Sequence, residues 1–116
     1  MDEDKKKATW AEFRRCVNLS PAEMEEWLAT EESNSVGDTK TRGGSGGEST
    51  GHKSGRRIVE IQRKKKAALS DDDYQHMRKV IGYVHRHLAQ RPMRDIIFSR
   101  WRYSLMNWGH DPLKDG

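Results

Sequence analysis

The residues of this chain that are best suited to chemistry are lysines and arginines in its second half. A helix is expected to begin at Ser54-Gly55-Arg56, where free backbone N–H groups suit a phosphate oxygen. On that helix the basic side chains lie on two sides of an apolar face, so they can meet a curved polyanion. Because backbone phosphates require positive charge and little base specificity, the pattern predicts binding to duplex DNA through phosphates. The predicted nucleic-acid-binding residues are Arg56, Arg57, Arg63, Lys64, Lys65, Lys66, Arg78, Lys79, Arg86, Arg100 and Arg102.

The charge of the chain changes sign along its length. Residues 1–33 contain five Lys or Arg and nine Asp or Glu, and residues 34–50 contain two of each. Residues 51–116 contain 15 Lys or Arg and seven Asp or Glu, within an overall net charge of +4. This asymmetry indicates either a polyanionic partner for the basic part or docking of the acidic part against it. The alternative is a solubilising face, with residues 64–66 partly paired to Glu60 or to the acidic helices.

The remaining candidate ligands and nucleophiles are scattered. The five histidines are His52, His76, His85, His87 and His110. His85 and His87 are two residues apart on a predicted helix, so they point to different sides. Cys16 is remote from them in sequence and is expected to be a small buried residue, so no metal site is expected. Residues 71–73, three aspartates, suit a helix N-terminus. With no paired nucleophile and base, we expect neither an enzyme nor a bound cofactor.

The amino-acid composition limits the classes of protein to which this chain can belong. Only 33% of the 116 residues are hydrophobic and 34% are charged, which predicts some disorder. A single cysteine excludes an intrachain disulfide and fits a reducing compartment. The first residues lack the apolar run of a signal peptide, and no stretch approaches the roughly 20 apolar residues that span a bilayer. We therefore expect an intracellular protein (cytoplasm, nucleoid or nucleus) with no membrane partner.

The elements that must position these residues are organised around a long helix between Ser70 and Pro92. Ser70 is a good N-cap, and Pro92 cannot continue the helix. The apolar residues between them are spaced alternately three and four apart, which aligns them on one side for packing. This stripe consists of Tyr74, Met77, Ile81, Val84 and Leu88.

The first half of the chain predicts a separate acidic unit. Residues 1–8 form a mixed-charge leader that is expected to be disordered. Thr9 and Ser20 each open a capping box, which predicts an acidic helical pair over residues 9–32. Residues 33–53 are rich in Gly, Ser and Thr and are expected to form a flexible linker.

The second half predicts a basic helical core over residues 54–112, followed by a tail over 113–116. A helix over residues 54–69 precedes the long one, and residues 92–99 form a connection. Ser99 caps a last helix with Trp101, Leu105 and Trp108 on its core side, and Gly109 suits a left-handed helix end. Tyr103 lies off that stripe and is the candidate for an exposed aromatic contact. No segment has a strand pattern, so we expect an all-α fold of about five helices.

Several long segments resemble one family of small bacterial and fungal proteins. These segments are WAEFRRCVNLSPAEMEEWLAT, STGHKSGRR, LSDDDYQHMRKVIGYVHRHLAQRP and SRWRYSLMNWGHDP. The chain is similar through them to the domain of unknown function 3140 family. Members of that family often carry the label DNA-binding, and the resemblance brings no catalytic motif. The glycine-rich linker and the apolar residues of the 92–99 connection depart from the family pattern.

These observations predict a non-catalytic nucleic-acid-associated protein that binds duplex DNA mainly through phosphates. The competing prediction is a protein-interaction or self-association module with no nucleic-acid role. In such a homodimer the acidic helices of one copy would meet the basic helices of the other.

Overall fold

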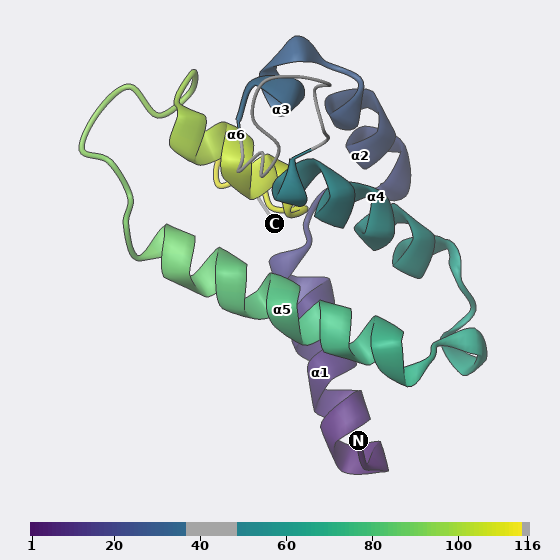
Figure 1. The fold of residues 1–116 in the computed structure, drawn as a ribbon. Helices are drawn as coiled ribbons and strands as arrows, with labels where there is room; N and C mark the ends of the chain where they lie inside the picture. Colours follow the sequence, from purple (N-terminus) through teal and green to yellow (C-terminus); the bar gives the residue numbers. More distant parts are fainter. Residues whose placement is uncertain (37–48, 115–116) are drawn as a thin grey trace.

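The computed structural model describes residues 1–36 and 49–114, and all regular structure within them is helical. The helices are α1 (Glu3–Cys16), α2 (Pro21–Leu28), α3 (Glu31–Ser35), α4 (Thr50–Arg63), the 3-10 turn η1 (Lys66–Ala68), α5 (Asp71–Leu88) and α6 (Arg100–Asn107). In Figure 1, α1 crosses behind α5, and α2, α3, α4 and α6 gather above it. The predicted all-α fold is confirmed.

Helix α5 is the long central element, as its spacing predicts. Tyr74, Met77 and Val84 of the predicted stripe are buried, and Ile81 and Leu88 are partly buried against the core. Ser70 and Asp73 form a capping box at its start. Helix α5 contacts α1, α4 and α6, so a single hydrophobic core joins the acidic and the basic parts of the chain.

The N-terminal segment is more ordered than predicted. Helix α1 begins at Glu3, so most of the expected disordered leader is helical. Asp2 caps this helix, because its carboxylate accepts a hydrogen bond from the backbone N–H of Lys5 at 2.8 Å. Thr9 is therefore a buried interior residue, and the capping box predicted there is wrong. An aspartate cap followed by two acidic residues provides a more favourable helix start further upstream.

Both ends of the expected linker are also folded. The predicted capping box at Ser20 is present, but the acidic pair is followed by α3, and Val36 beyond it is buried. At the other end Ser49 is buried and α4 begins at Thr50. The remainder of the predicted linker, residues 37–48, lies outside the described residues.

Helix α4 begins and ends earlier than predicted. The Ser49 hydroxyl caps it by accepting a hydrogen bond from the backbone N–H of His52 at 3.1 Å. Ser54 and Gly55 consequently lie buried in the helix interior, so the phosphate-binding helix start predicted at Ser54 is wrong. The chain leaves the helix at Lys64, so residues 64–66 do not extend its basic faces as expected.

Gly55 allows α4 to approach α2 and α6 closely. A Cβ atom at this position would lie 2.7 Å from the backbone oxygen of Asn107 and 2.7 Å from Cδ2 of Leu28. The buried Asn107 side chain accepts hydrogen bonds from Nε1 of Trp27 at 2.7 Å and from Oγ of Ser33 at 2.6 Å. The absence of a side chain at Gly55 therefore allows α4 to pack against Asn107. Asn107 in turn links α6 to α2 and α3 through its hydrogen bonds.

The junction between α4 and α5 is held by the carboxylate of Asp73, whose side chain is fully buried. It accepts hydrogen bonds from Nη2 of Arg57 at 2.9 Å, Nζ of Lys64 at 2.7 Å and the backbone N–H of Ser70 at 3.0 Å. Burial by itself raises the pKa of this carboxyl. The hydrogen bonds from Lys64, Ser70 and Arg57 nevertheless hold the pKa of Asp73 well below its usual range.

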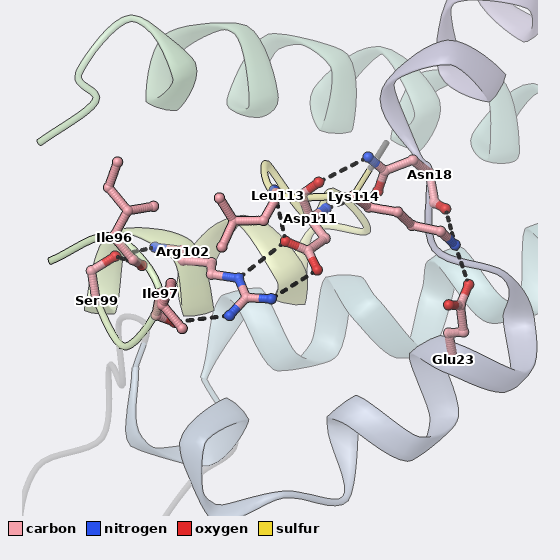
Figure 2. Close-up of polar contacts among 9 residues, drawn as sticks. All are labelled: Asn18, Glu23, Ile96, Ile97, Ser99, Arg102, Asp111, Leu113 and Lys114. Carbon is pink, nitrogen blue, oxygen red and sulfur yellow. Dashed lines mark hydrogen bonds and ion pairs between the residues drawn. The ribbon is translucent and has the colours of Figure 1, made fainter. Parts of the chain in front are cut away.

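Arg102 holds the C-terminal segment in place (Figure 2). Its Nε and Nη2 atoms donate to the two carboxylate oxygens of Asp111, each at 3.0 Å, and Nη1 donates to the backbone oxygen of Ile97 at 2.8 Å. The Asn18 side chain exchanges two hydrogen bonds with the backbone of Asp111, at 2.8 and 2.9 Å. Gly109 turns the chain with a φ of 87°, as predicted. These contacts tie the corner between α1 and α2 to the segment after α6.

Substitution of Gly55 tests the close helix contact. Gly55→Ala should destabilise the protein by about 1–3 kcal/mol, because the added methyl group meets a backbone oxygen. Gly82→Ala is the matched control, since its Cβ would approach only Nη1 of the flexible Arg86 side chain, at 3.2 Å. Alanine favours a helix interior by up to about 1 kcal/mol, so the control should be neutral or stabilised. Urea unfolding measures the stability of the two variants, and equal unfolding midpoints for Gly55→Ala and Gly82→Ala would contradict the contact at Gly55.

Substitution of Asp73 tests the α4–α5 junction. Asp73→Asn should lower the free energy of unfolding at neutral pH by about 2–3 kcal/mol, because Arg57 and Lys64 lose their common counter-charge. These cations are 36% and 40% exposed, so screening keeps the loss below that of a fully buried pair.

The pH dependence follows from the depressed pKa of Asp73. The carboxylate stabilises the fold fully above its unfolded pKa of about 4, and this stabilisation is lost as the pH falls toward the folded value. The difference between wild type and Asp73→Asn should therefore shrink progressively below about pH 4. Asp72→Asn, an exposed neighbour in the same helical turn, should have little effect at any pH. A difference that stays constant with pH would contradict this account.

Candidate functional site

Within residues 1–36 and 49–114, four of the eleven predicted DNA-binding cations are paired with carboxylates of the chain itself. Arg57 and Lys64 bind Asp73, and Arg102 binds Asp111. Arg63 forms an ion pair with Glu25 of the acidic helix α2. These four cations are therefore engaged by carboxylates of the folded chain and first of all stabilise the fold.

The other predicted cations are differently placed. Lys66 lies 6.0 Å from the ring of Trp10, in a cation–π contact, and Arg56 is exposed. Five further cations are exposed and, within residues 1–36 and 49–114, belong to no ion pair. These are Lys65, Arg78, Lys79, Arg86 and Arg100. The predicted set is therefore divided among several surfaces.

A groove of about 310 Å³ between α4 and α5 brings cations together. Lys53 and Arg57 come from α4, and Lys79 comes from α5. The remaining lining residues are Thr50, Ser54 and His76. Thr50 and Lys53 are missed as site residues because they are assigned to the predicted linker. In a helix that begins at Thr50, the residues three, four and seven positions later are Lys53, Ser54 and Arg57, so all four lie on one face.

His76 forms the uncharged wall of this groove. Its Nε2 atom lies 3.0 Å from Oγ of Ser54, and its ring stacks on Trp108 with 6.3 Å between centroids. Burial lowers the pKa of His76, and the nearby charges of Arg57 and Lys79 lower it further. The ring is therefore neutral at pH 7, and the positive charge of the groove comes from lysine and arginine.

Helix α5 continues the cationic surface beyond the groove. Arg86 is seven residues after Lys79, so the two lie on the same side of the helix. Gly82 lies between them and leaves space for the Arg86 side chain, whose Nη1 atom is 3.2 Å from where a Cβ of residue 82 would be. A stripe of positive charge therefore runs along α5 from Lys79 to Arg86.

A second hollow, of about 440 Å³, lies beside the corner between α1 and α2. Its lining includes the apolar side chains of Trp10, Phe13 and Pro21 and basic side chains such as Lys64 and Lys66. Lys64 is already bound to Asp73, so this hollow carries less available charge than its lining residues suggest.

The aromatic residues of α6 are partly buried and do not form an exposed contact surface. Tyr103, the predicted exposed candidate, packs on Trp27 with ring centroids 5.5 Å apart. Exposed apolar side chains occur instead in the connection before α6. Met93 is 99% exposed, Phe98 83% and Ile97 55%. The apolar residues of the 92–99 connection are therefore mostly not buried.

Cys16 is buried as expected, but it is not isolated from the histidines. Its Sγ atom lies 3.9 Å from Nε2 of His85, which the separation in sequence concealed. Burial raises the pKa of this thiol to about 11, and the neighbouring Glu12 carboxylate acts in the same direction. The same His85 nitrogen faces both Cys16 and Glu12, so the three do not form a relay that would activate a nucleophile.

No helix in the described part of the chain is long and apolar enough to cross a bilayer. Comparison with known proteins gives one result. A family model described as "Protein of unknown function (DUF3140)" matches residues 12–106. No curated protein and no solved structure matches the chain. The resemblance stated from the sequence is therefore confirmed, and the chain belongs to the DUF3140 family of proteins of unknown function.

Proposed function

We propose that this protein associates non-catalytically with nucleic acid and binds duplex DNA mainly through its phosphates. The observation that carries the proposal is the groove between α4 and α5. Lys53 and Lys79 line it and, within the described residues, have no carboxylate partner. Unpaired ammonium groups on a concave surface attract the DNA backbone and release its counterions.

The dimensions of α5 support contact with several phosphates. A helix rises about 1.5 Å per residue, so the cationic stretch from Lys79 to Arg86 is about 10 Å long. Phosphates of one DNA strand follow one another at about 3.4 Å along the axis, so roughly three lie within that length when α5 lies along the duplex. Arg57 is held at the groove by Asp73 and contributes less charge, because that carboxylate neutralises part of it.

Binding of this kind should depend weakly on DNA sequence. Contacts to phosphates orient a protein on the duplex but carry no direct information about bases. The exposed cations outside the groove, among them Lys65, Arg78 and Arg100, add to the long-range attraction that steers a polyanion toward the surface.

A second candidate function is self-association through the connection before α6. Met93 and Phe98 are large apolar side chains that are almost fully exposed, and Ile97 is more than half exposed. Exposed apolar side chains of this size are suited to protein contacts. Glu26, Glu31 and Glu32 are exposed acidic residues without an ion pair in the described part of the chain, and a second copy could provide cations for them.

Removal of the unpaired groove cations should weaken DNA binding. Wild type should lose about 10- to 40-fold in affinity for a 20-base-pair duplex between 50 and 200 mM salt, as expected for two or three phosphate contacts. Lys53→Ala/Lys79→Ala should bind more weakly at low salt and show a shallower salt dependence. Fluorescence anisotropy with duplexes of two unrelated sequences measures both quantities.

Lys5→Ala/Lys7→Ala is the charge-matched control for this experiment. It removes two exposed lysines from α1, outside the groove, and should retain most of the affinity. If wild type does not bind at low salt, or if the groove variant and the control bind equally, the DNA proposal fails.

Self-association through Met93 and Phe98 makes the opposite salt prediction, because salt screens ion pairs between copies but does not weaken apolar contact. If Met93 and Phe98 join two copies, sedimentation should detect a dimer that persists at high salt. Met93→Ser/Phe98→Ser should then be monomeric, whereas Leu113→Ser, which changes a separate exposed apolar residue, should remain dimeric. A wild-type monomer at all concentrations would exclude this alternative.

A further inference from the structure

One cluster of titratable side chains lies outside the groove, where α1 crosses α5. Glu12 and Cys16 are four residues apart on α1 and share a face, and His85 reaches them from α5. Oε1 of Glu12 is 3.1 Å from Nε2 of His85, Sγ of Cys16 is 3.8 Å from Oε1 of Glu12, and Sγ of Cys16 is 3.9 Å from Nε2 of His85. Among the described residues, no other group of three His, Cys, Asp or Glu side chains brings its ligand atoms this close together.

We propose that Glu12, Cys16 and His85 form a binding site for a divalent transition-metal ion, with Zn²⁺ as the best match. A thiolate, an imidazole and a carboxylate are the three ligand types that zinc accepts in proteins. Harder ions such as Mg²⁺ and Ca²⁺ prefer oxygen ligands only, so the sulfur and nitrogen disfavour them.

The ligand separations agree with tetrahedral coordination. Zinc bond lengths of about 2.0–2.3 Å place such ligand atoms about 3.3–3.6 Å apart. The observed distances of 3.1, 3.8 and 3.9 Å differ from this by a few tenths of an ångström. Small rotations of the partly exposed Glu12 and His85 side chains would close that difference while Arg15 stays bound to Oε2 of Glu12.

The surroundings of the cluster support a bound ion. Arg15 donates two hydrogen bonds to Oε2 of Glu12, at 2.7 and 3.1 Å, so the other carboxylate oxygen remains directed at Cys16 and His85. Nδ1 of His110 lies 2.7 Å from the backbone oxygen of Cys16 and holds the end of α1. Outer contacts of this kind orient metal ligands. Binding of the ion would release the Cys16 thiol proton to solvent, and the resulting thiolate and the Glu12 carboxylate together match the two charges of the ion.

One side of the cluster is open to solvent. Cys16 is 6% exposed, whereas the side chains of Glu12 and His85 are 32% and 59% exposed. Water would therefore complete the coordination. The ion would also link α1 directly to α5, so its binding should stabilise the fold. This site is independent of the DNA proposal, since none of its ligands lines the groove.

Cobalt(II) titration of the reduced full-length chain, purified without a histidine tag, tests the proposal. One Co²⁺ per chain should produce a thiolate-to-cobalt charge-transfer band and the strong visible bands of tetrahedral cobalt, and Zn²⁺ should remove both. At a hundredfold excess over its Kd, Zn²⁺ should raise Tm by roughly 5–15 °C. Absence of the charge-transfer band in the wild type would overturn the assignment.

Two variants identify the ligands. His85→Ala changes a well-exposed side chain, so it should fold normally while losing the charge-transfer band and the zinc-induced rise in Tm. Cys16→Ala should lose the band as well, and if it does not fold, His85→Ala still decides the question. His87→Ala, two residues away on the same helix, is the control and should keep the band. A band that survives in His85→Ala would also overturn the proposal.

Discussion

The buried carboxylate of Asp73 constrains the arrangement of the two helices that form the groove. A charged group removed from water requires compensation, and Asp73 obtains it from Arg57 in α4, Lys64 at the end of α4 and its own helix cap. These contacts determine where α4 stops and how α5 starts. They also hold Arg57 in the groove wall, beside Lys79. The shape of the groove between α4 and α5 thus depends on the buried hydrogen bonds of Asp73.

Part of the opposite charge of the two halves of the chain is paired within one molecule. Ion pairs join Arg63 to Glu25, Lys114 to Glu23 and Lys6 to Asp71 across the two parts. These pairs are open to solvent and screened by water, so the shared apolar core provides most of the attachment. The ion pairs instead orient the acidic helices and reduce the number of cations available to an outside partner. The docking interpretation of the charge asymmetry therefore accounts for part of the pattern, and the unpaired cations of α4 and α5 remain as the basis of the DNA proposal.

Helix α5 connects the two proposed binding sites. Toward α4 it presents His76 and Lys79, and toward α1 it presents His85. Both sites use side chains that are brought together by helix packing, with a partner helix on each side. A stable α5 is consequently needed for both, and its capping box and apolar stripe provide that stability. Because the two sites share this helix but no residue, they can be examined independently.

The periodicity of the sequence determined the helical class, the long central helix and the Ser20 and Ser70 caps, because these depend on interactions between residues close in the chain. Local patterns did not determine the start of α4 or the helical N-terminus, where competing caps at Ser49 and Asp2 are more favourable. Only the tertiary structure decided which cations are paired, since Asp73, Glu25 and Asp111 reach them through folding. The same holds for Cys16 and His85, which are far apart in sequence and become neighbours only because α1 crosses α5. Pairwise chemistry across helices depends on packing geometry, and no spacing along the chain encodes it directly.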